Sequence, residues 1–180
     1  MQKVLLRPIS VDDTDNIVRW RNSEQVKKNL FSQANITRES HLEYLKRFVE
    51  TGRCKQFIIE VTDSHLDIGT VFIKNIDEDN RKAEFGILIG EECARGKGYG
   101  TAATNQMLKI AFEKYKMNRV YLHVIEDNIA GIKAYLNAGF AKEGILKEEF
   151  RRGERYYNVV VMGITRSDWH RRNICNSNAK

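Results

Sequence analysis

Proline, cysteine and long apolar runs are scarce in this sequence of 180 residues. Pro8 is the only proline, and no segment rich in Gly, Ser or Pro interrupts the chain. Because linkers are rich in such residues and repeat arrays have a fixed period, we find neither a linker nor an internal repeat. A chain of this length buries a substantial core without metals or disulfides, so we expect a single domain over residues 1–170.

The three cysteines are Cys54, Cys93 and Cys175, which are odd in number and widely spaced. No CxxC pair is present, so the sequence favours plain thiols over a disulfide framework, and we expect no metal site. No apolar run approaches the roughly 18–20 residues that cross a bilayer, and the first residues lack the apolar stretch of a secretory signal. We therefore expect a cytoplasmic protein with no membrane partner.

Positive charge exceeds negative charge, with a formal net charge of +6 at pH 7. Such a balance attracts either nucleic acid or a ligand with several phosphates. The basic residues are scattered, except in His170-Arg171-Arg172, and no nucleic-acid motif accompanies that run. We expect residues 171–180 to form a basic, frayed tail, and we expect no nucleic-acid partner.

Apolar periodicity and capping residues divide the chain into strands and helices. The predicted strands are residues 4–7, 56–62, 68–76, 82–89, 119–125, 140–150 and 156–165. The predicted helices are residues 10–22 capped by Ser10, 37–51 capped by Thr37 and stopped by Gly52, 100–116, and 129–138 capped by Asp127 or Asn128 and ended by Gly139. The three strands after residue 55 predict an antiparallel meander, and the last two strands predict a closing hairpin around residues 152–154.

A glycine-rich turn, RGKGYG at residues 95–100, separates a predicted strand from a predicted helix. Closely spaced glycines leave backbone N–H groups bare where a helix N-terminus already favours an anion. Arg95 and Lys97 add positive charge, and Thr101 adds a hydroxyl at the first helical turn. The turn indicates a phosphate site, although a tight turn that only needs positive φ angles fits the same residues.

Two well-known phosphate loops do not fit this turn. A Walker loop has GxxxxGK followed by Ser or Thr, but Lys97 is followed by Gly98 and position 91 is Glu. A dinucleotide fingerprint is GxGxxG in the first β-α unit of a parallel sheet, whereas GKGYG is GxGxG and follows an antiparallel meander. The spacing excludes both loops without naming a third.

Arg95, Gly98 and Gly100 match the (Q/R)xxGx(G/A) pattern of the GNAT superfamily of acyl-CoA-dependent N-acyltransferases, which the chain resembles over essentially its whole length. Several further segments resemble the RimJ/RimL-like branch of this superfamily. They are LRPIS, AEFGILI, Asn128 with Tyr135, Gly139-Phe140 and VVMGITRSDW. The resemblance implies an α+β GNAT fold, with a mainly antiparallel twisted sheet, a central β-α-β crossover and helices on both faces. It implies transfer of an acetyl group from acetyl-CoA to a primary amine.

In this family the pyrophosphate of CoA lies on the glycine-rich turn, and the pantetheine arm pairs like an extra strand with the strand before it. The resemblance assigns these contacts to Arg95, Gly96, Lys97, Gly98, Tyr99, Gly100 and Thr101, and to Ile87, Leu88 and Ile89. Such pairing requires a strand that splays from its neighbour, with Gly86 or Gly90 as a candidate bulge. The free N–H groups would also polarise the thioester carbonyl, and Lys133 is expected near the CoA phosphates.

Asn128 and Tyr135 are seven residues apart, so on a helix that begins at Asn128 they share one face. The resemblance assigns to Tyr135 the proton for the leaving thiolate, and to Asn128 a cofactor contact or the helix end. The plainer interpretations are a core aromatic and an ordinary N-cap. Many relatives have Ser or Ala three residues after the asparagine, whereas this chain has Gly131.

Glu84 is a candidate general base, because an alkylammonium must lose a proton before it attacks the thioester. The rival interpretation is a surface carboxylate on an alternating strand. Alternation places Glu84 opposite Ala83 and Phe85 without showing which face meets the substrate.

The acceptor is expected to contact the first third of the chain. WRNSEQVKKNLF and ITRESHLEYL resemble acetyltransferases of amino-sugar nucleotides on the pseudaminic acid route, in which the positions of Arg21 and His41 contact the nucleotide-sugar. Arg suits a phosphate, and His suits a hydroxyl or a proton relay. Alternatively, Arg21 only ends its helix favourably and His41 lies on a solvated face.

Other acceptors stay open, because EGILKEEFRRGERYYN also resembles polyamine acetyltransferases and those of ribosomal-protein N-termini. A polyamine site favours clustered carboxylates, and the acidic cluster DEDN at residues 77–80 favours a turn instead. The competing class is a non-catalytic acyl-CoA binder, which would most simply lack the tyrosine that this chain has at Tyr135. We expect a small-molecule or peptide amine as partner, and a monomer or homodimer.

Overall fold

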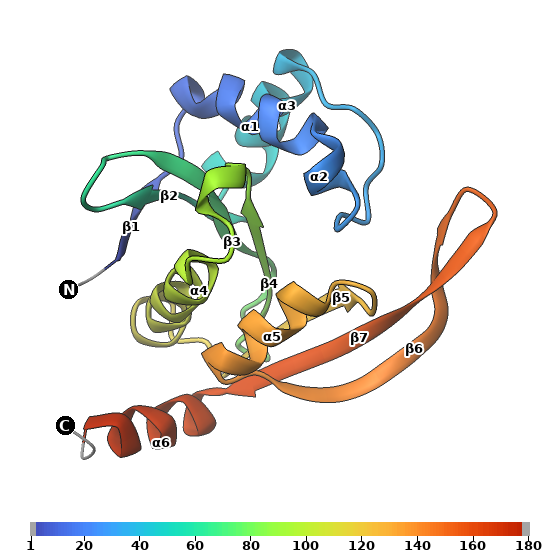
Figure 1. Cartoon of the computed structure of the whole chain (residues 1–180). Coiled ribbons are helices and arrows are strands. Elements are labelled where there is room, and N and C mark those ends of the chain that lie inside the picture. Colours follow the sequence, from blue (N-terminus) through green and yellow to red (C-terminus); the bar gives the residue numbers. More distant parts are fainter. Residues whose placement is uncertain (1–2, 178–180) are drawn as a thin grey trace.

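A seven-stranded sheet flanked by helices makes up the part of the chain that the computed structural model describes, residues 3–177 (Figure 1). The strands are β1 (Val4–Pro8), β2 (Lys55–Val61), β3 (Asp67–Asp77), β4 (Lys82–Ile89), β5 (Arg119–Ile125), β6 (Ala141–Arg152) and β7 (Arg155–Thr165). The helices are α1 (Thr14–Asn22), α2 (Glu24–Lys27), α3 (Arg38–Tyr44), α4 (Tyr99–Lys109), α5 (Ile129–Ala138) and α6 (Arg166–Ser177). Short 3-10 turns precede α1 and α4 at Val11–Asp13 and Glu92–Ala94, and π-helical segments extend α3 and α4 at Leu45–Glu50 and Ile110–Lys114.

The strands follow the order β1-β2-β3-β4-β5-β7-β6, and every neighbouring pair is antiparallel except β4 and β5. The chain makes this parallel step through α4, because parallel neighbours need a crossover connection. The predicted meander, the β-α-β crossover and the closing hairpin are therefore confirmed, and so is the GNAT fold.

Helices cover both faces of the sheet. Because successive strand residues point to opposite faces, their apolar side chains form two separate clusters, one on each face. On one face, Ala83 and Phe85 of β4 pack with Met107 of α4 and Ile132 of α5. On the other face, β2 and β4 supply Ile58 and Leu88, which pack with Ile17 and Trp20 of α1 and Val26 of α2. Figure 1 shows α1–α3 on the opposite side of β4 from α4. Each fully buried large apolar side chain contributes roughly 1.5–3 kcal/mol.

The predicted helix boundaries agree with the caps that the structure shows. The Ser10 and Thr37 side chains accept hydrogen bonds from the N–H groups of Asp12 and Ser40, as N-caps do. Gly139 ends α5 in the left-handed conformation, with φ 101°, which glycine adopts without a Cβ penalty. These ends are set locally, so the sequence alone predicts them.

The C-terminal segment differs from the expected frayed tail, because residues 171–177 continue helix α6. Trp169 packs against Phe112 with ring centroids 5.5 Å apart, and Arg172 donates a hydrogen bond to the carbonyl of Asn137. These contacts anchor the helix to the domain. Residues 178–180 and the Cys175 side chain lie outside the described part of the chain. No helix within residues 3–177 is long and apolar enough to cross a membrane.

Candidate active site

The parallel strands β4 and β5 separate after a short paired stretch. They pair only over Lys82–Glu84 and Arg119–Tyr121. Beyond this point β5 continues to pair with β7 as far as Ile125, and β4 continues to pair with β3 as far as Ile89. Between Phe85 and Ile89 the edge of β4 that faces β5 therefore has backbone groups to offer to a ligand, and the predicted residues 87–89 lie on this stretch.

The two glycines that flank this stretch have different roles. Gly86 pairs with Phe72 in regular register, and a Cβ there would overlap the Phe72 ring, so the bulge suggested for Gly86 is wrong. The N–H groups of Gly90 and Glu91 both donate to the carbonyl of Ile68, at 2.8 Å and 3.1 Å. In a bulge, two residues of one strand lie opposite a single residue of its neighbour. Gly90 therefore marks a bulge at the end of β4.

The glycine-rich turn lies directly after this bulge and begins α4. Gly96 and Gly98 have φ angles of 73° and 81°, and Gly98 is the N-cap residue of α4. A Cβ at Gly96 would meet no atom within 4 Å, and one at Gly98 would meet only Lys3 Nζ at 3.8 Å. Backbone conformation, rather than packing, explains these glycines, and the space over them is open. The turn thus fits a phosphate group at the positive end of the α4 dipole.

Tyr135 lies on α5, on the same face of the sheet as α4. Its ring makes edge contacts with Phe85 of β4 and with Phe140, at centroid distances of 6.0 Å and 6.1 Å. Burial raises the pKa of Tyr135 to about 12, so the phenol keeps its proton at neutral pH. Among the described residues its hydroxyl has no hydrogen-bond partner. The core-aromatic interpretation of the Tyr135 ring is therefore confirmed, and its role as proton donor stays a prediction.

Asn128 caps α5, because its Oδ1 accepts a hydrogen bond from the N–H of Gly131 at 3.0 Å. A Cβ at Gly131 would meet the Asn128 Nδ2 atom at 2.6 Å. The glycine that this chain has in place of the Ser or Ala of many relatives therefore leaves room for this cap. The cap interpretation of Asn128 is confirmed, and its cofactor contact stays a prediction. Lys133 lies exposed on the same helix, and its contact with CoA phosphates also stays a prediction.

Glu84 faces the side of the sheet that α1–α3 cover, opposite to its neighbours Ala83 and Phe85. It occupies the last paired position before the splay, and its side chain is 16% exposed. Asn75 Nδ2 donates to Glu84 Oε2 at 2.7 Å, and Lys74 Nζ and His123 Nδ1 each lie 3.7 Å from Glu84 Oε1. The carboxylate and Tyr135 thus belong to opposite faces at the same opening.

His123 was not singled out from the sequence. It lies two residues beyond Tyr121 on β5, and its ring is edge-on to the Tyr121 ring at 5.8 Å. Alternation in RVYLHVI does place Tyr121 and His123 on one face of a strand. Only the pairing of Glu84 with Tyr121 brings that face beside the carboxylate, and this pairing is not readable from either strand alone.

On the α1–α3 side His41 is buried and Arg21 is half-buried. Arg21 Nε and His41 Nε2 are buried without a hydrogen-bond partner among the described residues, although His41 Nδ1 lies 3.1 Å from Thr14 Oγ1. Burial lowers the pKa of Arg21, and burial followed by the Arg21 charge lowers the pKa of His41. The solvated face suggested for His41 is wrong, because the residue is 4% exposed. Arg21 does lie in the last turn of α1, so the helix-end interpretation also holds.

Tyr44 and Cys54 lie next to His41 and extend this cluster of polar side chains. The Tyr44 ring stacks on His41 at a centroid distance of 6.3 Å, and the Tyr44 hydroxyl donates to Cys54 Sγ at 3.2 Å. Burial raises the pKa of both Tyr44 and Cys54, so both stay protonated. Cys54 is therefore an inert hydrogen-bond acceptor rather than a nucleophile.

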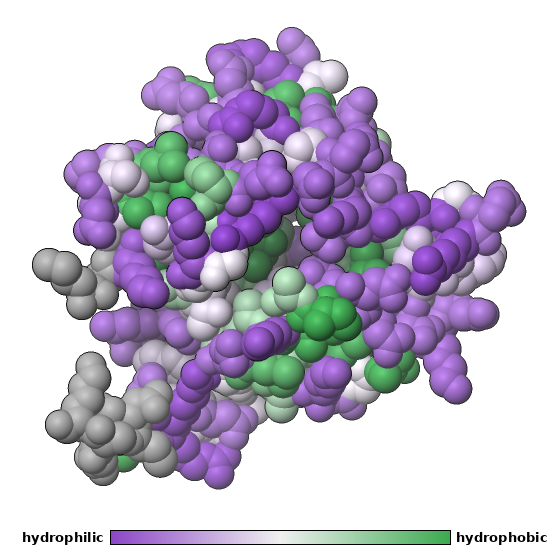
Figure 2. All heavy atoms as spheres, viewed as in Figure 1, coloured by the Kyte–Doolittle hydropathy of each residue, from purple (hydrophilic) through white to green (hydrophobic). Residues whose placement is uncertain are grey.

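Side chains near the tip of the β6–β7 hairpin contact the loop after α2. Arg152 Nη2 donates to the carbonyl of Lys28 at 3.0 Å, and the Phe150 ring meets Phe31 edge-on at 5.3 Å. Figure 2 shows a hollow between the α1–α3 region and α5, which this hairpin flanks. Within residues 3–177 no group of three or more His, Cys, Asp or Glu side chains could hold a metal ion.

Comparison with known proteins agrees with this geometry. Residues 3–141 match a family model described as an acetyltransferase (GNAT) domain. The spermidine N(1)-acetyltransferase of Vibrio cholerae is 28% identical over 167 residues, which cover 93% of this chain and 95% of that protein. A structure of the Vibrio cholerae spermidine N-acetyltransferase in complex with CoA and spermine has a TM-score of 0.87, with 27% identity over 94% of this chain and 99% of that one. The acetyltransferase PseH of Campylobacter jejuni is 29% identical over 128 residues, which cover 71% of this chain and 76% of that protein.

Proposed function

This chain belongs to the GNAT acetyltransferase family and is an acetyl-CoA-dependent N-acetyltransferase, and from that premise we propose that its acceptor is a primary amine on a small molecule that also carries phosphate. An amino-sugar nucleotide is such a molecule. Arg21 carries this proposal, because it is a half-buried side chain whose buried Nε atom has no hydrogen-bond partner among the described residues. The place of the protein in the RimJ/RimL-like branch, its location in the cell and its oligomeric state stay predictions.

The reaction uses the two sides of the splay between β4 and β5. The turn at residues 95–101 holds the pyrophosphate of CoA, and the free edge at residues 87–89 holds the pantetheine arm and polarises the thioester carbonyl. The acceptor nitrogen attacks the carbonyl carbon, so that a C–N bond forms and the C–S bond breaks. Tyr135 gives its proton to the departing sulfur, because burial keeps this phenol protonated at neutral pH. The new amide nitrogen then loses its second proton, which restores the phenol of Tyr135. The acetylated acceptor and CoA then leave.

The proton of the acceptor ammonium goes to Glu84, on the opposite face. This carboxylate already lies beside Lys74, Asn75 and His123, so its negative charge is held in place before the acceptor arrives. His123 faces Glu84 across the start of the splay, with its Nδ1 atom 3.7 Å from Glu84 Oε1. We assign the pair the task of taking the proton and passing it to water.

Electrostatics favour an anionic acceptor over a polycation on this side. A buried cation that lacks a carboxylate attracts phosphate strongly and repels an alkylammonium, because the interior screens charge less than water does. Within residues 3–177 no carboxylate forms an ion pair with Arg21, so its positive charge is not offset by a direct partner. The Nε2 atom of His41 is buried and free to bond a hydroxyl of the acceptor.

A polyamine is the second candidate acceptor. It is supported by the similarity to spermidine acetyltransferase over nearly the whole of both chains. A polyamine would use Glu84 for its reacting amine and would need further carboxylates for its other amines. The two candidates therefore make opposite demands on Arg21.

The deciding experiment measures release of the CoA thiol from acetyl-CoA with one acceptor at a time. The panel is a nucleotide-linked amino sugar, spermidine, a peptide with a free N-terminus and a reaction without acceptor. We expect the highest kcat/KM with the amino-sugar nucleotide. Preferred turnover of spermidine or of the peptide would overturn the acceptor proposal and keep the enzyme class, whereas tight CoA binding with no turnover of any amine would indicate a non-catalytic acyl-CoA binder.

A further inference from the structure

A second concave site lies at the opposite end of the sheet from the splay. It is a cavity of about 610 Å³, formed where β2, β4 and β5 begin and where β3 ends. Strand β4 has eight residues and runs from this cavity to the glycine-rich turn. At about 3.3 Å per residue, the two ends of the strand are roughly 25 Å apart, so the cavity is separate from the acetyl-transfer site.

The wall of this cavity is strongly cationic. Glu78 is the one carboxylate that lines it, against five cations from four segments of the chain. The cations are Arg53, Lys55, Arg81, Lys116 and Arg166. Within residues 3–177 none of these five takes part in an ion pair, whereas Arg7, Arg19 and Arg119 each face a carboxylate. Gathered cations without counter-charges raise the local potential and favour a bound anion.

The backbone that carries two of these cations is strained. Arg81 and Lys116 have φ angles of 49° and 55°, in the left-handed region that glycine favours. The Arg81 carbonyl accepts hydrogen bonds from the N–H groups of Asn118 and Arg119, at 2.6 Å and 3.1 Å, which hold the two loops together. Strain of this kind costs about 1–3 kcal/mol per residue and concentrates at ligand clamps. The loops are thus held in a defined shape with their cations around one opening.

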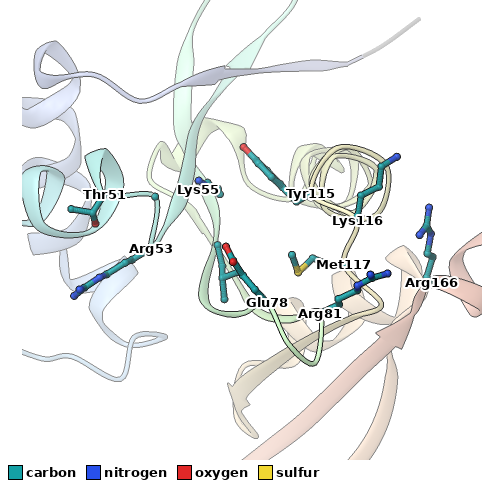
Figure 3. Close-up of a pocket in the computed structure, with 11 residues that line it drawn as sticks. Thr51, Arg53, Lys55, Glu78, Arg81, Tyr115, Lys116, Met117 and Arg166 are labelled. Carbon is teal, nitrogen blue, oxygen red and sulfur yellow. The ribbon is translucent and has the colours of Figure 1, made fainter.

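An apolar and aromatic floor completes the cavity. Figure 3 shows Tyr115 and Met117 between Lys55 on one side and Arg81 on the other. Met117 is buried, and Lys55 Nζ lies 5.5 Å from the centroid of the Tyr115 ring. Small-molecule sites of roughly 300–1,000 Å³ combine such apolar walls with a few charged groups. A small ligand therefore fits better here than a flat contact with a protein.

We propose that this cavity is a second binding site, for a small polyanion that carries two or more phosphate groups. The phosphates pair with the cations around the opening, which are Arg53 and Lys55 at the start of β2, Arg81 of the β3–β4 turn, Lys116 before β5 and Arg166 at the start of α6. The remainder of the ligand contacts Tyr115. The site requires neither the acceptor cleft nor the acetyl group, so its existence does not depend on the acceptor assigned above.

The test is a calorimetric titration of inorganic tripolyphosphate into the full chain saturated with CoA, so that the glycine-rich turn is already occupied. The cavity variant carries Arg53→Gln, Lys55→Gln and Arg166→Gln. The control variant carries Lys109→Gln, Lys142→Gln and Lys147→Gln, which remove the same charge from exposed positions on α4 and β6. We expect saturable binding that weakens at least about tenfold in the cavity variant, the loss expected from charge-assisted hydrogen bonds, and stays unchanged in the control.

Equal weakening in both variants would reduce the effect to net charge and overturn the site, as would the absence of saturable binding. A parallel titration with oligothymidylate separates a small ligand from nucleic acid, because tighter binding of the oligonucleotide than of tripolyphosphate would overturn the small-ligand assignment. Thermal unfolding checks that each variant folds. If the cavity variant is unstable, the single change Arg53→Glu at an exposed side chain tests the same point.

Discussion

The two faces of the sheet differ in the groups that they offer to ligands. The face under α4 and α5 offers backbone N–H groups of the turn and of β4, and one phenol, that of Tyr135. The face under α1–α3 offers charged and polar side chains, and buried nitrogens of Arg21 and His41 there have no partner among the described residues. A backbone site depends on glycines and strand pairing, whereas a side-chain site depends on each residue in it. We therefore propose that the first face, the cofactor face, binds acetyl-CoA, and that the second, the acceptor face, sets the specificity.

The largest expected effect is on the cofactor face. Tyr135→Phe should lower kcat by roughly 10²–10⁴, the usual contribution of a general acid, and should leave CoA affinity nearly unchanged, because the ring still packs against Phe85 and Phe140. Steady-state kinetics and CoA titration measure the two quantities. Tyr115→Phe, at the far end of the sheet, is the matched control. A large loss of CoA affinity with kcat intact would contradict the assignment.

The next largest effect is expected on the face under α1–α3, where Glu84 and His123 are proposed to take the proton of the acceptor amine. Glu84→Gln and His123→Gln should each lower kcat/KM by about 10–100-fold at neutral pH, and part of the loss should return at alkaline pH, where more of the amine is neutral. His65 lies 2.6 Å from Glu60 on the surface and forms the same type of pair. His65→Gln is therefore the control, and an equal loss in that variant would remove the special role of His123.

The cofactor face should also respond to backbone changes alone. Gly98→Val introduces a β-branched residue at a φ of 81° and a side chain over the pyrophosphate position. We expect the KM for acetyl-CoA to rise by about tenfold or more, with a smaller change in kcat. Gly153→Val, at a φ of 58° in the hairpin turn, imposes similar strain away from the site. Normal CoA binding by the Gly98 variant would count against the turn.

Specificity on the acceptor face should change with a single side chain. Arg21→Gln removes a charge-assisted hydrogen bond worth about 1.5–3 kcal/mol, so the KM for a phosphate-bearing acceptor should rise by at least about tenfold. The KM for spermidine should stay the same or fall, because the repulsion is gone. Arg47→Gln, an exposed change after α3, is the control. Loss of spermidine turnover instead would favour a polycation site.

The smallest effect is expected on the free energy of unfolding, and it comes from His41 on the face under α1–α3. Burial and the Arg21 charge lower the pKa of His41, with Asp13 opposing them. Between this lowered value and the ordinary value of about 6.5, the unfolded chain binds more protons than the folded chain. Stability should therefore fall as the pH drops below about 6.5, by a few degrees in Tm, or about 1 kcal/mol for a chain of this size. His41→Gln should flatten this slope in thermal unfolding, whereas His65→Gln should leave it as it is.

Local features explain why much of the fold was predictable. The caps at Ser10, Thr37 and Asn128 and the stop at Gly139 depend on residues within one turn of each other. The strand pattern depends on alternation of neighbouring residues. Residues 171–177 were expected in a frayed tail but are helical, and the contact of Arg172 with the carbonyl of Asn137 joins segments far apart in the chain.

The candidate site was predictable only in part for the same reason. The sequence by itself determined the glycine-rich turn, the cap of α5 at Asn128 and the positions of the strands along the chain, since each rests on short-range spacing. Only the tertiary structure decided that Glu84 faces α1–α3 beside His123, that His41 is buried and Arg21 half-buried, and that cations from four segments surround a second cavity. Strand pairing and helix packing bring these residues together, and neither is encoded in the spacing of any one segment.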